Sequence, residues 1–140
     1  MDESSLLLRQ IPHSIEAEQS VLGAMLIDAR CIPDVVEALT GEDFYLKANR
    51  EIYETIYTMF NFSATIDPVT VLDQMKLTGV YDENTSRSYL LQLMEITPTA
   101  ANVKEYIRIV KDKALLRRIA ETAGELTTLV QEGGETAQAV

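Results

Sequence analysis

The chain has 140 residues, of which 46% are hydrophobic and 24% charged, with 6 Gly and 4 Pro. This composition indicates about one soluble globular domain and excludes a disordered chain. The formal net charge of −10 argues against a domain whose whole surface binds nucleic-acid phosphates, because such domains concentrate Lys and Arg.

Apolar residues recur at helical spacing along almost the whole chain, and no stretch alternates long enough to predict a strand. The sequence therefore predicts an all-α fold. The first helix begins after Ser14, a good N-cap, and carries Glu16 and Glu18 where the positive end of the helix dipole favours acids. It ends near Asp28, and the small Gly23 within it permits close contact with a second helix.

Four more short helices complete a compact head of about five. The second has Pro33 in its first turn and is expected to end at Gly41. The third spans about 47–60. In the fourth, Asp67 is the expected N-cap before Pro68, and Gly79 after residue 78 is expected to form a left-handed C-cap. The fifth is expected at 88–96.

One long helix follows, from an expected N-cap at Thr99 to the Gly133-Gly134 pair. A helix of about 30 residues extends about 45 Å, whereas a compact chain of this length has a radius of gyration near 14 Å. The helix should therefore project from the head. Gly133-Gly134 is interpreted as the turn of a helical hairpin, whose returning helix would begin at Glu135 and be cut off at Val140.

The apolar stripe of the long helix shifts by one position halfway along. Its first half comprises Val103, Ile107, Val110 and Ala114, and its second half comprises Leu115, Ile119, Ala123, Leu126 and Val130. The shift predicts that the two halves pack against different surfaces. No local core can reach the second half, so we expect it to be a self-association surface.

The long helix also carries a concentration of basic residues. Six of the 12 Lys and Arg lie between positions 104 and 118, where only Glu105 and Asp112 oppose them. Lys104, Arg108 and Lys111 form one face that meets an acidic surface or DNA. Alternatively, it is a solvated face with local pairs such as Arg108 with Asp112, at four-residue spacing.

Enzyme chemistry and membrane insertion are not expected. The lone Cys31, expected to be buried, and the lone His13 cannot form a disulfide, a His/Cys metal site or a catalytic dyad. Pairs of acids such as Glu42 with Asp43 lie at helix starts or in loops, where acids are stabilising or solvated. The longest stretch without a charge, 55–66, is too short to span a bilayer. Acidic residues at the N-terminus do not fit a secretory signal, so a cytoplasmic location is expected.

Several blocks of residues identify a family resemblance. Arg9 to Asp28 reads RQIPHSIEAEQSVLGAMLID, and further blocks follow in order: EDFY (42–45), REIY (50–53), IDPVT (66–70), Tyr89-Leu90 and PTAANV (98–103). Together, over about 9–131, they resemble the opening of replicative DNA helicases of the DnaB family. The residues 84–88 depart from the family pattern, which usually has a Gly pair there.

The resemblance implies a tail (1–13), a helical head (14–98) and a long helix starting a hairpin (99–140). Such domains form a collar of paired units, as dimers within a hexameric ring, and dock primase and a helicase loader or initiator. It also implies a cytoplasmic, nucleoid-associated replisome protein. The helicase-binding domain of primases, or another replisome adaptor, is the alternative, although the Pro12 to Gly23 block favours the helicase.

The resemblance places the motor chemistry outside these residues. ATP and Mg²⁺ need a phosphate loop of the form G-x-x-x-x-G-K-[ST], and no glycine of this chain begins one. In the family this loop belongs to a separate ATPase domain, which also makes most of the contacts with DNA. We therefore expect no catalytic, cofactor-binding or metal-binding residues in this chain.

Overall fold

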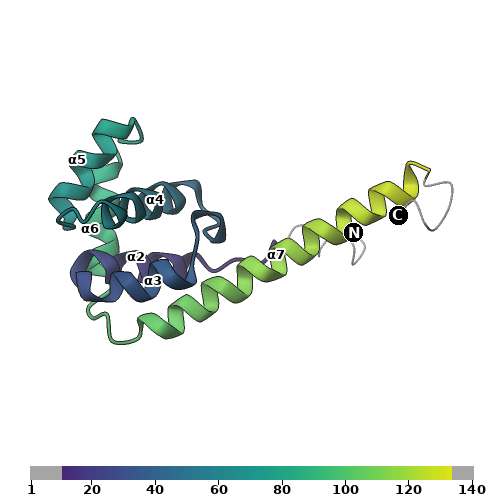
Figure 1. Cartoon of the computed structure of the whole chain (residues 1–140), viewed down its shortest axis with the longest axis horizontal. Helices are drawn as coiled ribbons and strands as arrows, with labels where there is room; N and C mark the ends of the chain where they lie inside the picture. Colours follow the sequence, from purple (N-terminus) through teal and green to yellow (C-terminus); the bar gives the residue numbers. More distant parts are fainter. Residues whose placement is uncertain (1–10, 134–140) are drawn as a thin grey trace.

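The computed structural model describes residues 11–133, which form helices and no strand. The α-helices are α2 (Ile15–Ile27), α3 (Ile32–Ala38), α4 (Lys47–Asn61), α5 (Pro68–Thr78), α6 (Ser86–Glu95) and α7 (Val103–Gln131), with 3-10 turns η1 (Ala29–Cys31) and η2 (Gly41–Asp43). In Figure 1, α2 to α6 gather at one end, and α7 runs past them and projects away. The predicted all-α architecture, a head of five short helices followed by one long helix, is confirmed.

The helix α2 is the centre of the head, with contacts to α4, α6 and α7. The Ser14 hydroxyl accepts a hydrogen bond from the backbone N–H of Ala17 at 3.2 Å, as expected of an N-cap. Gly23 lies so close to α6 that a Cβ there would collide with the carbonyl oxygen of Leu93 and with the Thr97 side chain. The predicted role of this glycine in close helix contact is confirmed.

The prediction that Gly41 ends the second helix is wrong. The helix α3 ends at Ala38, and Gly41 begins the separate turn η2. The carboxylate of Asp43 accepts a hydrogen bond from the backbone N–H of Thr40 at 2.8 Å and so closes this turn on itself. The side chain of Asp43, and not the glycine, therefore stabilises the turn that leads from α3 to α4.

The start of α5 matches its local signals. Asp67 accepts a hydrogen bond from the backbone N–H of Thr70 at 2.8 Å, and Gly79 follows the helix with φ +80°. α6, in contrast, begins at Ser86, two residues before the predicted start. The side chain of Asp82 accepts from the backbone of residues 84 and 85 at 2.8 and 3.2 Å. This turn shapes the segment that departs from the family pattern.

The long helix begins later than predicted. Thr99 is not its N-cap, because its hydroxyl accepts from Ala101 N–H at 3.1 Å in a preceding turn, and α7 starts at Val103 after Asn102. The first stripe is buried as predicted: Val103, Ile107, Val110 and Ala114, with α7 packed against α2 and α3. The expected returning helix at 135–140 lies outside the described residues.

Within residues 11–133, no helix combines the length and the apolar character needed to cross a membrane.

Candidate functional site

The distal half of α7, beyond Ala114, carries the proposed self-association residues. Leu115 is 52% exposed, Ile119 56%, Leu126 44% and Val130 63%, and Ala123 is also exposed. They share one side of the helix, and Figure 1 shows this half extending beyond the head. The side chains are thus available to another surface, and self-association remains a prediction.

Two further leucines of this half were not singled out from the sequence. Leu116 and Leu129 are 47% and 49% exposed. With Leu129 included, residues 115, 119, 122, 126 and 129 follow the alternating spacing of four and three that is typical of a coiled-coil seam. Testing the stripe against a heptad would have identified Leu129, although Thr122 weakens the pattern.

The buried and exposed stripes point in different directions. At about 100° per residue, the one-position shift after Ala114 turns the distal stripe well away from the head-facing side. The head can therefore hold the proximal half of α7 while a second helix packs on the distal half. This geometry explains how one continuous helix could serve two surfaces.

Two residues of the basic face make contacts within the chain. Lys104, Arg108 and Lys111 are exposed, but Arg108 donates hydrogen bonds to Asp112 at 3.0 Å and to Glu105. The hydrogen bond and charge of Arg108 lower the pKa of Glu105. Lys111 donates to the carbonyl oxygen of Ala38 at 2.7 Å. The contacts of Arg108 favour the interpretation as a solvated face with local pairs, including the expected pair with Asp112, whereas Lys111 binds α3.

Beyond Ala114, Arg117 and Arg118 hydrogen-bond α7 to other segments of the described chain. Arg117 donates one hydrogen bond to the carbonyl oxygen of Pro12 at 2.9 Å and another to that of Asp43 at 2.7 Å. Arg118 donates to the Asp43 carboxylate at 3.0 Å. Tyr45 completes the cluster, since the Arg117 guanidinium lies 5.5 Å from its ring centroid. Sequence reasoning counted both arginines only as part of the basic run.

Two acids that the sequence places at a helix start or in a loop are buried. Glu18 is 1% exposed, and its carboxylate accepts hydrogen bonds from Tyr45 N–H at 2.7 Å, Leu46 N–H at 3.3 Å and the Asn49 amide at 3.0 Å. It therefore holds the backbone that leads into α4, whose N-cap, Leu46, has no capping side chain of its own. Asp43 is 2% exposed. Such acids were expected to be stabilising at a helix start or solvated. These two are not solvated, because tertiary packing brings distant donors to them.

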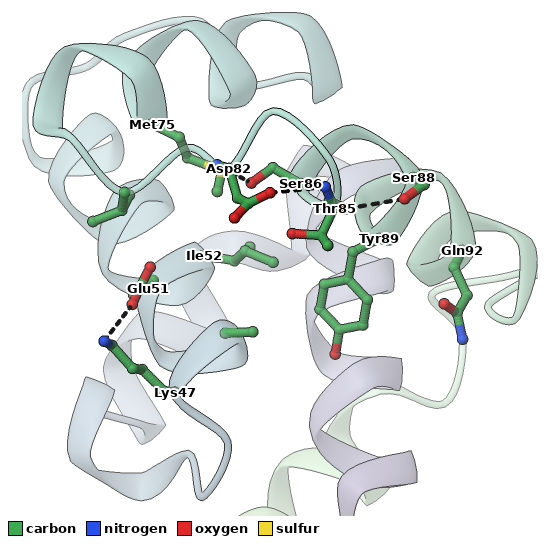
Figure 2. Close-up of a pocket in the computed structure, with 12 residues that line it drawn as sticks. Lys47, Glu51, Ile52, Met75, Asp82, Thr85, Ser86, Ser88, Tyr89 and Gln92 are labelled. Carbon is green, nitrogen blue, oxygen red and sulfur yellow. Dashed lines mark hydrogen bonds and ion pairs between the residues drawn. The ribbon is translucent and has the colours of Figure 1, made fainter.

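A cavity of about 530 Å³ opens between α4 and α6 (Figure 2). Its hydroxyl groups have structural partners: Ser86 accepts from Asp82 N–H at 2.8 Å, and Ser88 donates to Thr85 O at 3.0 Å. Tyr89 donates to the Asn49 side chain, and burial raises the pKa of its hydroxyl. The hydroxyl groups of Ser86, Ser88 and Tyr89 thus bond to backbone or amide groups.

The lone cysteine and histidine have structural surroundings. Cys31 is half-buried, not fully buried as expected, and burial together with the charge of Asp28 raises its thiol pKa to about 11. His13 stacks on Tyr45 with ring centroids 4.4 Å apart. Within the described part of the chain, no three His, Cys, Asp or Glu side chains are grouped to hold a metal ion.

Comparison with known proteins identifies relatives of this sequence. Residues 10–112 match the family model of the DnaB-like helicase N terminal domain. The replicative DNA helicase DnaB of Leifsonia xyli subsp. xyli is 37% identical over 121 residues, which are 86% of this chain and 26% of that protein. DnaB of Geobacillus stearothermophilus is 39% identical over 122 residues, 87% of this chain and 26% of that protein. The chain thus spans about a quarter of the length of these curated relatives.

Solved structures agree in fold. The N-terminal domain of DnaB helicase from Mycobacterium tuberculosis has a TM-score of 0.87 and 37% identity, with 93% of each chain covered. The N-terminal domain from Helicobacter pylori, described together with its interactions with primase, has a TM-score of 0.71 over 94% of this chain and 99% of that one. At 18% identity it shows likeness of fold alone. The family resemblance read from the sequence is confirmed, and the chain belongs to the family of DnaB-like helicase N-terminal domains.

Proposed function

We propose that this chain is the non-catalytic collar module of a replicative DNA helicase, which self-associates through the distal half of α7 and presents its head to replisome partners. The observation that carries the proposal is the exposed apolar side of that half. The family membership supports it, and the relatives' greater length leaves room for a motor domain. A helicase-binding domain of a primase is less favoured, because these relatives are helicases.

The energetics of the exposed stripe support self-association. Covering a large aliphatic side chain contributes about 2 kcal/mol, so Leu115, Ile119, Leu126 and Val130 together offer about 8 kcal/mol before the costs of association. The opposite side of the same half carries polar residues such as Glu121, exposed as well. An amphipathic projecting helix of this kind fits packing against a second helix.

The parent helicase would unwind duplex DNA with ATP and Mg²⁺ bound in its motor domain. In such a protein this module would assemble the dimers of a hexameric ring and dock primase, with a loader or initiator as a further partner. DNA would be held mainly by the motor domain, in keeping with the net charge of −10. The division into a head at 14–98 and a hairpin from 99 onward is part of the proposal.

Analytical ultracentrifugation tests the self-association surface. The wild-type chain should show a mass that rises with concentration, because association of the stripe follows mass action. Leu126→Asp places a charge in the stripe and should abolish the rise while the helical circular dichroism of the head is kept. Thr128→Asp is the matched control, since it adds the same charge to the other side of α7 and should leave the rise unchanged.

Two results would contradict the proposed surface. If the wild-type chain had the mass of a monomer at all concentrations, the proposal that this chain self-associates would be wrong. If Leu126→Asp and Thr128→Asp both abolished the rise in mass, the added charge and not the position in the stripe would be the cause.

Calorimetric titration with a purified primase C-terminal domain tests partner docking separately. We expect weaker binding to the chain ending at Val140 than to one extended through the returning hairpin helix. An interface of ordinary size needs about 800 Å² from each partner, and a primase that bridges two paired heads would lose part of it. Equal binding would place the docking surface wholly on the head, and no binding by either chain would overturn this role.

A further inference from the structure

Arg117 and Arg118 lie at the point where α7 leaves the head, and they bind two other segments of the chain. We propose that these two arginines form a clamp that sets the direction in which the distal half of α7 projects from the head. This inference concerns the geometry within one chain and does not depend on the proposed self-association.

The clamp connects three separate parts of the sequence. Arg117 holds the carbonyl oxygen of Pro12, in the segment before α2, and the carbonyl oxygen of Asp43, in η2. These partners lie 105 and 74 residues away along the chain. A guanidinium presents several donors in a fixed planar fork, so one side chain can hold both carbonyl groups in a defined relative position.

The two arginines lie on either side of the buried stripe. At about 100° per residue, Arg117 lies roughly 50° to one side of the line through Val103 and Ala114, and Arg118 roughly 50° to the other. The buried stripe alone keeps α7 against the head but forms a single line of contact. From these two sides both arginines reach Asp43, and Arg117 also reaches Pro12, so their hydrogen bonds oppose rocking of the helix about that line.

The clamp binds a well-fixed part of the head. The connector that it binds, residues 40–46, is also held by the buried carboxylate of Glu18, which accepts hydrogen bonds from the backbone N–H groups of Tyr45 and Leu46. Asp43 also bonds to Thr40 within the connector. The arginines therefore attach α7 to a segment that cannot shift freely on the head.

Because the clamp lies at the base of the distal half, a small rotation there moves the end of α7 by several ångströms. From Arg117 to Gln131 the helix rises about 21 Å, so a rotation of about 10° at the clamp would displace the end of α7 by about 4 Å. Ala114 is the last buried residue of α7. The clamp therefore adds one turn of anchored helix and decides where the exposed stripe lies relative to the head.

The ion pair of Arg118 is suited to this role. The Asp43 side chain is 2% exposed and that of Arg118 is 49% exposed. An acid buried to this degree is screened little by salt and loses a favourable partner when the arginine is removed. The pair should hold at physiological ionic strength.

Pulsed electron paramagnetic resonance measures the projection angle directly. In the 140-residue chain with Cys31→Ser, spin labels are placed at Thr58→Cys on α4 and Glu125→Cys on α7, both exposed positions, and labelled protein is diluted with unlabelled protein. We expect one narrow distance distribution for this chain. Arg117→Ala with Arg118→Ala should broaden the distribution and shift its mean, while circular dichroism shows the helices intact.

The matched control is Arg108→Ala, which also removes an arginine from α7. Its ion-pair partners, Glu105 and Asp112, are both on the same helix, so the distribution should stay narrow. The conservative pair Arg117→Lys and Arg118→Lys keeps the charges without the fork and should broaden it less than alanine does.

The outcomes separate a clamp from a merely stabilising contact. A distribution unchanged in the double alanine variant would overturn the proposal, even if its melting temperature fell. Equal broadening in Arg108→Ala would overturn it as well, because loss of any helix charge would then suffice. Neither result bears on the sedimentation test of self-association, so the two proposals fail independently.

Discussion

The carboxylate of Glu18 in α2 accepts a hydrogen bond from the side-chain amide of Asn49 in α4 at 3.0 Å, and both side chains are buried. The same carboxylate accepts the backbone N–H groups of Tyr45 and Leu46 at the start of α4. Asn49 in turn accepts a hydrogen bond from Tyr89 in α6. One side chain of the central helix therefore fixes the start of a second helix and connects to a third.

Replacement of this acid should weaken the head. Glu18→Gln keeps the shape but removes the charge, and its NH₂ group cannot accept from the backbone donors. We expect the free energy of unfolding to fall by about 2 kcal/mol, the usual contribution of hydrogen bonds to a charged group. Urea titration followed by circular dichroism measures the change. Glu16→Gln is the control, because Glu16 is exposed on the same turn, and equal midpoints for both variants would refute the assigned role.

Any larger residue at Gly23 should lower the stability of the head. A methyl group there would collide with the backbone oxygen of Leu93 and with Thr97, so α2 and α6 would have to separate. We expect Gly23→Ala to lower stability by roughly 1–3 kcal/mol, as overpacking does, and thermal unfolding would show it.

Gly124→Ala provides the contrasting substitution. Gly124 lies in α7, and a Cβ there would meet no atom within 4 Å. Because alanine favours a helix interior over glycine, the free energy of unfolding should rise by about 0.5–1 kcal/mol. If both glycine variants were stabilised, the close approach of α2 to α6 would be wrong.

Cys31 should react slowly with thiol reagents. Burial and the charge of Asp28 raise its pKa from 9.0 to about 11, and only the thiolate is nucleophilic. The rate of alkylation by iodoacetamide in the folded chain should therefore rise only toward pH 11. In the urea-unfolded chain the rise should come near pH 9. Coincident pH profiles for the two states would contradict the assigned surroundings.

The same shift has a consequence for stability. Because the folded chain holds the thiol proton more tightly than the unfolded chain, the contribution to stability is complete below about pH 9 and is lost as pH rises toward 11. Unfolding midpoints of wild type should fall over this range, and those of Cys31→Ser should fall less. A parallel decline of the two chains would show that other groups dominate.

Helix starts and ends were predictable where a local signal had no competing turn beside it. Ser14 and Asp67 each cap the helix that follows them, and Gly79 has the left-handed conformation expected of it. The errors arose where a nearby side chain formed a competing turn. Asp43 closes η2 after Gly41, and Thr99 caps a short turn before α7 instead of the helix itself.

The sequence by itself determined the all-helical class, the projection of α7 and its division into two stripes, because periodicity and length are properties of the chain alone. Only the tertiary structure decided which polar groups meet. Glu18 finds its backbone partners 27 and 28 residues away, and Arg117 finds its own 74 and 105 residues away. No local pattern encodes such pairs, because an acid or an arginine on an exposed helix turn has the same sequence context as one that packing buries. The physical reason is that burial removes water from these groups, and each then requires the particular donor or acceptor that the fold brings to it.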